Sequence, residues 1–377
     1  MPKHPHENKT PVESLITILR EVPDPRLDRS KDHELTDILA IALCTILVGG
    51  ESFYDMEEFA QVRLDWLKTF LTLRHDAPSH DTFNRVFQAL DHNQLADALS
   101  RWTQSVRVAL GGEVVALDGK SLRRAFNQGE SFRTIVSAWA TESGLLLGQR
   151  KVADKSNEIT AVPELLRVLE LSGCIVTADA MHCQKNIAKE IIEADAQYVL
   201  ALKGNQGTAF AEIKLFLDEA VERQAPHLVG KETVEKGHGR IETRRYWQSQ
   251  EIKWFADRQN WEGLRSVGLV ESVRESNGQR SIERRYYLSS LPNDVNQFAR
   301  AVRGHWSIEN QLHWVLDVVF GEDQSRARTA QAAENLAAIR RLAVNILRRD
   351  KKCKRSLKGK LMRAAIDPQF LKHLLTN

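Results

Sequence analysis

The sequence is poor in cysteine, nearly neutral in net charge, and without a long apolar run. Its 4 cysteines, Cys44, Cys174, Cys183 and Cys353, are scattered and form no C-x-x-C pair. This distribution argues against a zinc–cysteine site and makes a reducing cytoplasm the simplest location to expect. The formal net charge of +3 neither requires nor excludes a polyanionic partner.

Membrane and export signals are also lacking. The longest apolar run, from Ile38 to Gly50, is too short to span a bilayer and is typical of a buried core helix. The stretch MPKHPHENKT at the N-terminus is polar and has no apolar segment of the kind that secretory signals carry. We therefore expect a cytoplasmic protein with no membrane partner.

What the sequence does contain is the composition of a globular protein in several parts. Hydrophobic residues make up 42% and charged residues 27% of the 377 residues, and this length favours two or three domains. Apolar residues recur at helical intervals in residues 12–105, so we predict a helical N-terminal domain over residues 1–105. With basic positions such as Arg85, this domain could bind the ends of a DNA duplex or serve as a scaffold.

From Glu113 onward, short apolar strands alternate with helices. Two strands within residues 134–153 are joined by a turn at Glu142–Gly144. They follow a first strand that starts at Glu113 and stops at an acid and a glycine, Asp118 and Gly119. This succession predicts an α/β fold with a mixed sheet flanked by helices. The elements expected next are a helix at 160–171, a strand at 173–181, a helix at 184–195 and a strand at 196–205.

Residues 206–292 differ from their surroundings. We predict a helix at 208–224 followed by a mostly β insertion, in which Asn277-Gly278 is a strong hairpin signal. Helical periodicity returns as one long helix over residues 294–320. The predicted catalytic unit is therefore discontinuous, with residues 106–205 joined by residues 293–350 and the β-rich insertion between them.

The segment from Arg340 to Arg363 is basic, with Asp350 as its single acid. Either it forms a solvated helix face or it contacts phosphates as a positively charged patch. We assign residues 351–377 to a basic C-terminal tail.

Two aspartates follow apolar strands. Asp118 and Asp179 each stand where an apolar run stops, and that edge of an open α/β sheet is where ligand sites form. A lone Asp in such a place is also a common turn or cap residue. Converging carboxylates with a third acid suit Mg²⁺ or Mn²⁺ and the two-metal chemistry of phosphodiester cleavage. Beyond Glu309, the acids that compete for the third place are Asp317, Glu322 and Asp323.

The segment GHWSIENQLHW concentrates chemistry on one helix. His305, Glu309 and His313 recur every four residues and form one stripe. The two histidines lie about 12 Å apart along the axis, too far to share one zinc ion with bonds of about 2 Å. Glu309 borders the apolar face that packs on the sheet, and metal coordination would explain a carboxylate there. Trp306 and Trp314 are expected mainly to pack.

Six segments of the chain resemble one family. They read ALDGKSLRRA, DKSNEITAVPELL, VTADAMHCQKNIA, ALKGNQG, GHGRIETRR and VRGHWSIENQLHWVLDVVFGEDQSRAR. In this order they look like the H-repeat-associated group of bacterial insertion-sequence transposases. The segment DPRLDRSKDHELTDILAIALCTILVGGESFYDMEEFA resembles the helical part that precedes the catalytic domain in that group, so the resemblance covers about Val22 to Leu371.

The resemblance implies a DDE transposase domain with an RNase H-like fold. Carried over by motif, the catalytic and metal-binding acids are Asp118 in LDG, Asp179 in TADA and Glu309 in HWSIEN. The implied cofactor is Mg²⁺, for which Mn²⁺ can substitute. The family's tyrosine–arginine–glutamate–lysine signature is incomplete here, because Arg303 precedes Glu309 without the usual Tyr, and Leu316 replaces the Lys.

The implied partner is double-stranded DNA, at element ends and at the target. A homo-oligomer on DNA and association with the nucleoid are further family expectations. Positive residues around the acids fit a polyanionic substrate, although each alone could be a solvated charge. We predict DNA contacts for Lys120, Arg123, Arg124, Lys203, Arg240, Arg244, Arg303, His305 and Arg326.

The predicted function is therefore a metal-dependent DNA transposase that cuts element ends and joins them to target DNA. Two alternatives stay open: a domesticated or inactive relative that acts only as a nuclease, and a non-catalytic DNA-binding protein. A two-carboxylate glycoside hydrolase is a third reading. The many Lys and Arg residues around the acids argue against it, because a neutral sugar would not need them.

Overall fold

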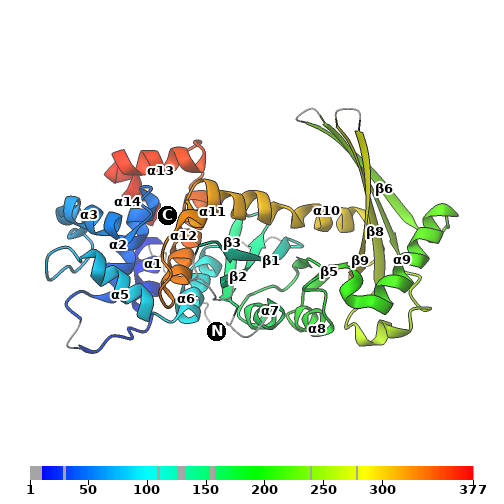
Figure 1. Ribbon diagram of the computed structural model, residues 1–377, viewed down its shortest axis with the longest axis horizontal. Helices are drawn as coiled ribbons and strands as arrows, with labels where there is room; N and C mark the ends of the chain where they lie inside the picture. The colour runs from blue at the N-terminus through cyan, green and yellow to red at the C-terminus, as the bar shows by residue number, and fades with distance from the viewer. Residues whose placement is uncertain are drawn as a thin grey trace, which may run out of the picture.

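A mixed sheet runs through the centre of the molecule, with helices on both of its faces (Figure 1). The computed structural model describes residues 11–28, 31–107, 111–124, 133–152, 158–237, 240–276 and 279–376. Within these residues nine strands form one sheet in the order β3-β2-β1-β4-β5-β9-β8-β7-β6. The strands are β1 Val114–Leu122, β2 Arg133–Ala140, β3 Leu145–Lys151, β4 Ile175–Ala178, β5 Gln197–Leu202, β6 Val229–Gly237, β7 Arg240–Ser249, β8 Ser266–Ser276 and β9 Gln279–Ser289.

The pairing confirms the predicted mixed α/β class. β1 pairs antiparallel with β2 and parallel with β4, and β4 pairs parallel with β5. The predicted β insertion does not form a sheet of its own, because β9 pairs antiparallel with β5 from Val199↔Ser289 to Leu202↔Tyr286. Residues 206–292 therefore extend the central sheet. The hairpin signal Asn277-Gly278 lies outside the described residues, although β8 and β9 pair up to Ser276↔Gln279 beside it.

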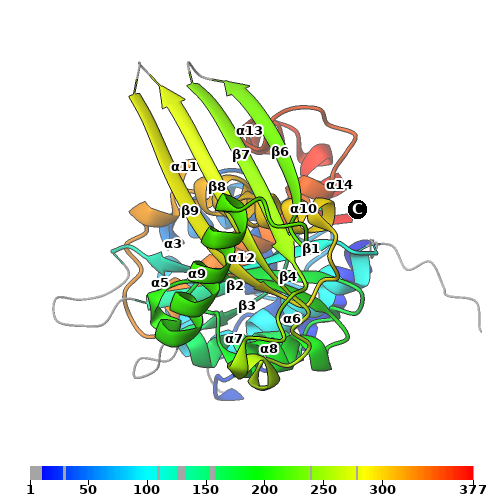
Figure 2. The same ribbon diagram turned by 90° about the vertical axis from the view of Figure 1, so that its right-hand side faces the viewer.

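The four strands β6 to β9 are long and reach beyond the helices that flank the sheet (Figure 2). Their far halves are largely exposed; in β6 every residue except Thr233 is exposed. The near halves of β7, β8 and β9 are buried. This part of the molecule is an arm that grows out of the sheet rather than a separate body.

Helices from both ends of the chain gather into one layer beside β3 (Figure 1). One hydrophobic core contains Leu15 and Leu19 of α1, nearly all of α2, and Phe370 and Leu374 of α14. No helix among the described residues is long and apolar enough to cross a membrane. The helices of this layer are α1 Pro11–Arg20, α2 Leu35–Leu47, α3 Phe53–Val62, α4 Leu64–Leu67, α5 His80–Ala89, α6 His92–Val106, α12 Ala332–Arg349, α13 Leu357–Ile366 and α14 Pro368–Thr376.

The basic segment 340–363 is largely built into this layer. Arg340 and Arg341 are buried, and Arg341 forms an ion pair with Glu322 of 2.6 Å, in which both side chains are 1% exposed. Lys360 is also buried, and its Nζ lies 3.2 Å from Asp350. A solvated face and a phosphate patch are both wrong for these three cations, because each is enclosed by protein. The cations of the segment that are exposed are Lys351, Lys352, Lys354, Arg355, Lys358 and Arg363.

The remaining helices cover the sheet and connect its strands. On one face lie α7 and α8, which pack on the core formed by Val115, Leu117 and Val176. On the other face lies α10, which packs on Val114 and Ile175. These elements are α7 Glu158–Arg167, α8 Lys185–Glu193, α9 Gly207–Glu222, α10 Val295–His305 and α11 Trp314–Val318, with short 3₁₀ turns at Gly204–Gln206, Ala256–Asn260 and Glu322–Gln324.

The predicted long helix over 294–320 is interrupted. α10 ends at His305, and a π-helical turn, Glu309–His313, precedes α11. Single π turns are rare in proteins, and those that occur often lie at functional sites. The helical path as a whole lies across β1, β4, β5 and the start of the arm (Figure 1).

A glycine lets α10 approach the sheet closely. A Cβ added to Gly268 of β8 would lie 2.4 Å from the ring of Phe298 in α10, too close for any real contact. Phe298 is fully buried in the core between α10 and the sheet. Gly268 thus sets the distance between the sheet and the helix that leads to Glu309.

We predict that Gly268→Ala destabilises the protein by about 1–3 kcal/mol, because the methyl group overpacks the contact with Phe298. Urea unfolding followed by circular dichroism measures the change. Gly207→Ala at the start of α9 is the matched control, since no atom lies within 4 Å of its added Cβ. Equal stability of the two variants would contradict the proposed close packing.

Candidate active site

Three acids from three elements open into one cavity. Asp118 of β1, Asp179 just after β4 and Glu309 of the π turn line a cavity of about 230 Å³. Strand alternation explains the first two, because residues two apart share a face of a sheet. Val114 and Ile175 pack under α10, so Asp118 and Asp179, each four residues further on, point to the same face.

The sequence suggested that the strand ends at Asp118, but the strand continues beyond it. β1 continues to Leu122 and pairs Asp118 with Ser137 of β2. Its other neighbour, β4, ends at Ala178, which pairs with Leu117. Asp118 is therefore the first residue of β1 that has lost its partner on the β4 side. The open edge forms in the middle of β1, beside Asp179.

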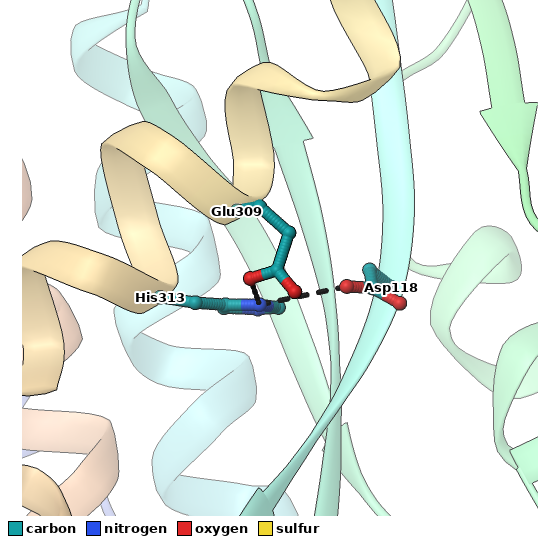
Figure 3. A group of neighbouring side chains, drawn as sticks. All are labelled: Asp118, Glu309 and His313. Carbon is teal, nitrogen blue, oxygen red and sulfur yellow. Dashed lines mark hydrogen bonds and ion pairs between the residues drawn. The ribbon is translucent and has the colours of Figure 1, made fainter. Parts of the chain in front are cut away.

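Histidines accompany each of the acids. The Nδ1 atom of His313 lies 3.2 Å from Oε2 of Glu309 and 3.5 Å from Oδ2 of Asp118 (Figure 3). The Nδ1 atom of His182 lies 3.0 Å from Oδ1 of Asp179, whose carboxylate also accepts the backbone N–H of His182.

Burial and mutual repulsion act on the acids. Burial is the largest cause that raises the pKa of Asp118, and the charges of Glu309 and Asp179 add to it against an opposing effect of His313, so that the pKa lies at about 6. The hydrogen bond to His313 holds the pKa of Glu309 below its usual value. Burial alone would raise the pKa of Asp179, but the hydrogen bonds and charge of His182 outweigh it and lower the pKa.

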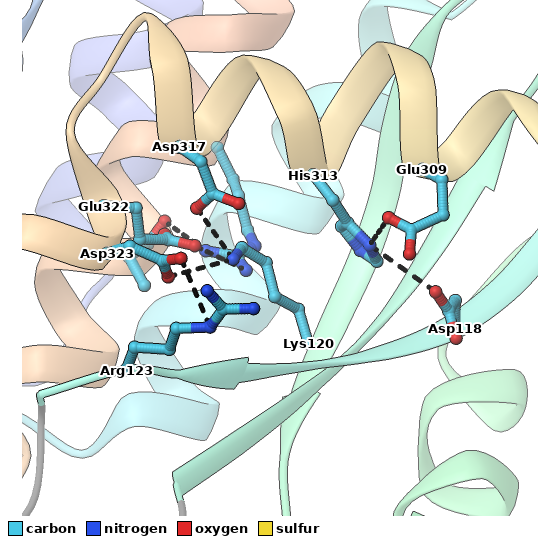
Figure 4. A network of polar contacts seen from close by, with 10 residues as sticks. Asp118, Lys120, Arg123, Glu309, His313, Asp317, Glu322 and Asp323 are labelled. Atoms are coloured by element: carbon cyan, nitrogen blue, oxygen red, sulfur yellow. Dashed lines mark hydrogen bonds and ion pairs between the residues drawn. The ribbon is translucent and has the colours of Figure 1, made fainter.

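The competing acids belong to a separate, neutralised cluster (Figure 4). Lys120, two residues after Asp118, is buried and lies 2.8 Å from Asp317 and 3.2 Å from Asp323. Glu322 is buried against Arg341. By contrast, among the described residues the ion-pair partners of the three cavity acids are histidines.

The donor set fits a divalent cation. Asp118, Glu309 and His313 each offer a ligand atom, and these atoms lie within 4.8 Å of one another. Carboxylate oxygens are the ligands that Mg²⁺ and Mn²⁺ prefer, and Asp179 adds another at the same cavity. A cation placed there would relieve the repulsion that raises the pKa of Asp118.

Five of the residues predicted to contact DNA are exposed, as is Arg303, which is described with the ion pairs below. Lys203 lines the cavity itself. Arg123 is 77% exposed and lies 3.4 Å from Asp323, and Arg124 donates a hydrogen bond to Gln324. Arg240 begins β7 on the arm, and Arg326 follows the 3₁₀ turn after α11. Contact of these residues with DNA stays a prediction.

Four others have their polar groups occupied by the protein. Lys120 bridges β1 to Asp317 and Asp323, as described above. Arg244 and Arg303 both pair with Glu235, at 3.1 Å and 2.9 Å. His305 lies with Nδ1 3.1 Å from the hydroxyl of Thr177, and burial lowers its pKa to about 4. A neutral His305 offers a phosphate a hydrogen bond but no charge.

Two residues of the site were missed from the sequence, namely His182, which contacts Asp179, and Arg285, which lines the cavity, and two tryptophans were misjudged. Nothing drew attention to His182, although its spacing of three after Asp179 was a usable signal. Arg285 also lines the cavity, and its guanidinium lies 4.9 Å from the ring of Trp306. The prediction that Trp306 and Trp314 mainly pack is wrong, because they are 42% and 56% exposed.

Comparison with known proteins gives matches over most of the chain. A family model described as Transposase DDE domain matches residues 109–346, and one described as DDE_Tnp_1-associated matches residues 16–103. The putative transposase YncI of Escherichia coli O157:H7 is 37% identical over 97% of this chain and 95% of its own length. The H repeat-associated putative transposase YhhI of E. coli strain K12 is 36% identical over 97% of this chain and 98% of its own. A short K12 relative, named inactive transposase YbfQ, is 33% identical over 20% of this chain and 89% of its own length.

We predict that Asp118→Asn stabilises the metal-free protein at pH 8. The folded-state pKa of Asp118 is raised from 3.8 to about 6, so its protonated form adds stability below pH ~4 that is lost as the pH rises through 6. The variant lacks this ionisation and should gain about 2–3 kcal/mol over the wild type.

Denaturant unfolding in a chelator, at pH 8 and at pH 4, measures this difference. The gain should shrink to near zero at the lower pH. A variant that is less stable than the wild type at pH 8 would show that the carboxylate carries no electrostatic penalty in the fold.

Proposed function

Because this chain belongs to the family of transposases with a DDE domain, we propose that it cuts DNA at the ends of an insertion sequence and joins them to target DNA. The RNase H-like fold of that domain agrees with the order β3-β2-β1-β4-β5. The observation that carries the proposal is the convergence of Asp118, Asp179 and Glu309 on one cavity. These acids face each other and histidines, whereas the neighbouring acids are neutralised by Lys and Arg.

In this proposal the three carboxylates hold divalent ions and do not attack the substrate. Bound Mg²⁺ or Mn²⁺ would activate the attacking oxygen, first of water and then of a DNA 3′-hydroxyl, and would stabilise the oxygen that leaves phosphorus. His182 fixes the Asp179 carboxylate through its hydrogen bond. Lys120 ties the strand of Asp118 to α11, which continues from the turn of Glu309.

Positive groups at the rim would receive the phosphates. Lys203 and Arg285 line the same cavity as the acids. Lys203 directly follows β5, and Arg285 lies within β9 beside the last pair of these two strands, Leu202↔Tyr286. A phosphodiester between them would have its charge balanced on the side away from the carboxylates. We also propose that the protein works as a homo-oligomer that bridges two DNA ends.

We predict that Asp118→Ala, Asp179→Ala and Glu309→Ala each lower Mg²⁺-dependent cleavage of an element-end duplex by about 10³-fold or more. Asp323→Asn is the matched control, because this carboxylate lies in the neighbouring cluster paired with Lys120, and cleavage should stay within about tenfold. Undiminished cleavage by all three alanine variants would refute the assignment.

DNA binding without turnover is the second candidate, and the relative named an inactive transposase favours keeping it. It predicts binding that weakens steeply with salt while Mg²⁺ produces no cleavage. A strand-transfer assay with pre-cut ends separates the transposase from a nuclease that cuts but does not integrate. Joined products with pre-cut ends would support the transposase.

A further inference from the structure

We propose that His313 is a protein ligand of the divalent ion that Asp118 and Glu309 hold, and that its nitrogen makes this site favour Mn²⁺ over Mg²⁺. The inference rests on the proposed function in one respect, namely that these acids bind metal. The inference adds a nitrogen ligand to the three carboxylates, and with it a preference for Mn²⁺ over Mg²⁺ that an all-oxygen site would lack.

The distances are those of neighbouring ligands on one ion. Nδ1 of His313 lies 3.2 Å from Oε2 of Glu309 and 3.5 Å from Oδ2 of Asp118 (Figure 3). Ligand atoms bound at about 2.1 Å in adjacent octahedral positions are separated by about 3 Å. A small shift of the side chains would therefore place one ion in contact with all three atoms.

The π turn explains how one helix supplies two of these ligands. Glu309 and His313 are the first and last residues of the turn. A π turn contains more residues than the 3.6 of an α turn, so side chains four apart point more nearly in the same direction. Both side chains point toward Asp118 on β1, as Figure 3 shows.

His313 differs from an ordinary surface histidine because its side chain is buried. Its side chain is 7% exposed, while Glu309 is 56% exposed and leaves the site open to solvent on one side. Its Nε2 atom has no hydrogen-bond partner among the described residues, so the groups it faces through Nδ1 are the two carboxylates. Without a metal, Nδ1 is hydrogen-bonded to Glu309. With the ring proton on Nε2, the same Nδ1 atom would present its lone pair, and an ion between it and the two carboxylates would replace the hydrogen bond.

The chemistry of the nitrogen donor gives the preference. Mg²⁺ is bound mainly through oxygen and holds its waters strongly, whereas affinity for nitrogen donors rises along the transition metals from Mn²⁺ onward. His305 is not part of this set, because its Nδ1 is engaged with Thr177. A single histidine thus joins the ion, in keeping with the distance that prevents both histidines of this helix from sharing one.

The test uses the full chain loaded with Mn²⁺ and pulsed electron paramagnetic resonance, which detects nitrogen bonded to the ion. The wild type should show the ¹⁴N coupling of a coordinated imidazole, and ¹⁵N-histidine labelling should change it. His313→Asn should abolish the coupling and weaken Mn²⁺ binding by about tenfold or more, with a smaller effect on Mg²⁺. The Asn side chain can still donate a hydrogen bond to Glu309, and His305→Asn, on the same helix, should keep the coupling.

The outcomes separate this inference from the proposed function. Mn²⁺ binding that Asp118→Asn abolishes, without ¹⁴N coupling in the wild type, would overturn the role of His313 and leave the metal site intact. Mn²⁺ affinity that is unchanged in Asp118→Asn would overturn both. The wild-type and labelled spectra do not depend on the folding of any variant, so a poorly folded His313→Asn leaves the test decisive.

Discussion

The carboxylates of Asp118, Asp179 and Glu309 repel one another, and the rest of the structure has to hold them together against this repulsion. Burial and the charges of Glu309 and Asp179 together raise the pKa of Asp118 to about 6, so the acids are held closer than they would stay alone. Parallel pairing of β1 with β4 fixes two of them, and the contact of Phe298 with Gly268 holds the helix that leads to the third. Lys120, the cation nearest to Asp118 in sequence, pairs with Asp317 and Asp323 and therefore does not neutralise the acids of the cavity.

Local patterns were enough to predict much of this arrangement. Strands β1 to β5 follow from short apolar runs, and the two aspartates at the sheet edge follow from where those runs stop. The strand of Asp118 was predicted too short, because alternation cannot show that β2 keeps pairing after β4 has ended. The π turn likewise has no sequence signature separate from an α-helix.

Long-range partners account for the remaining differences. Arg340 and Arg341 look like a surface charge run in sequence, yet Arg341 forms its ion pair in the interior, with Glu322 of the 3₁₀ turn that precedes α12. The contact of Trp306 with the guanidinium of Arg285 joins the end of α10 to β9 of the arm. Neither pairing is visible until the chain is folded. The roles of the acids in catalysis and of the basic residues in DNA contact stay predictions.

The core shared by helices from both ends of the chain has a consequence for synthesis. α1 packs on α14, and α12 packs on α2, α5 and α6. Contacts of such high sequence separation form slowly, and a nascent chain cannot complete this layer until its last helices have left the ribosome. A copy of the gene that is cut short would leave α1 and α2 with uncovered apolar faces, marked for aggregation or degradation.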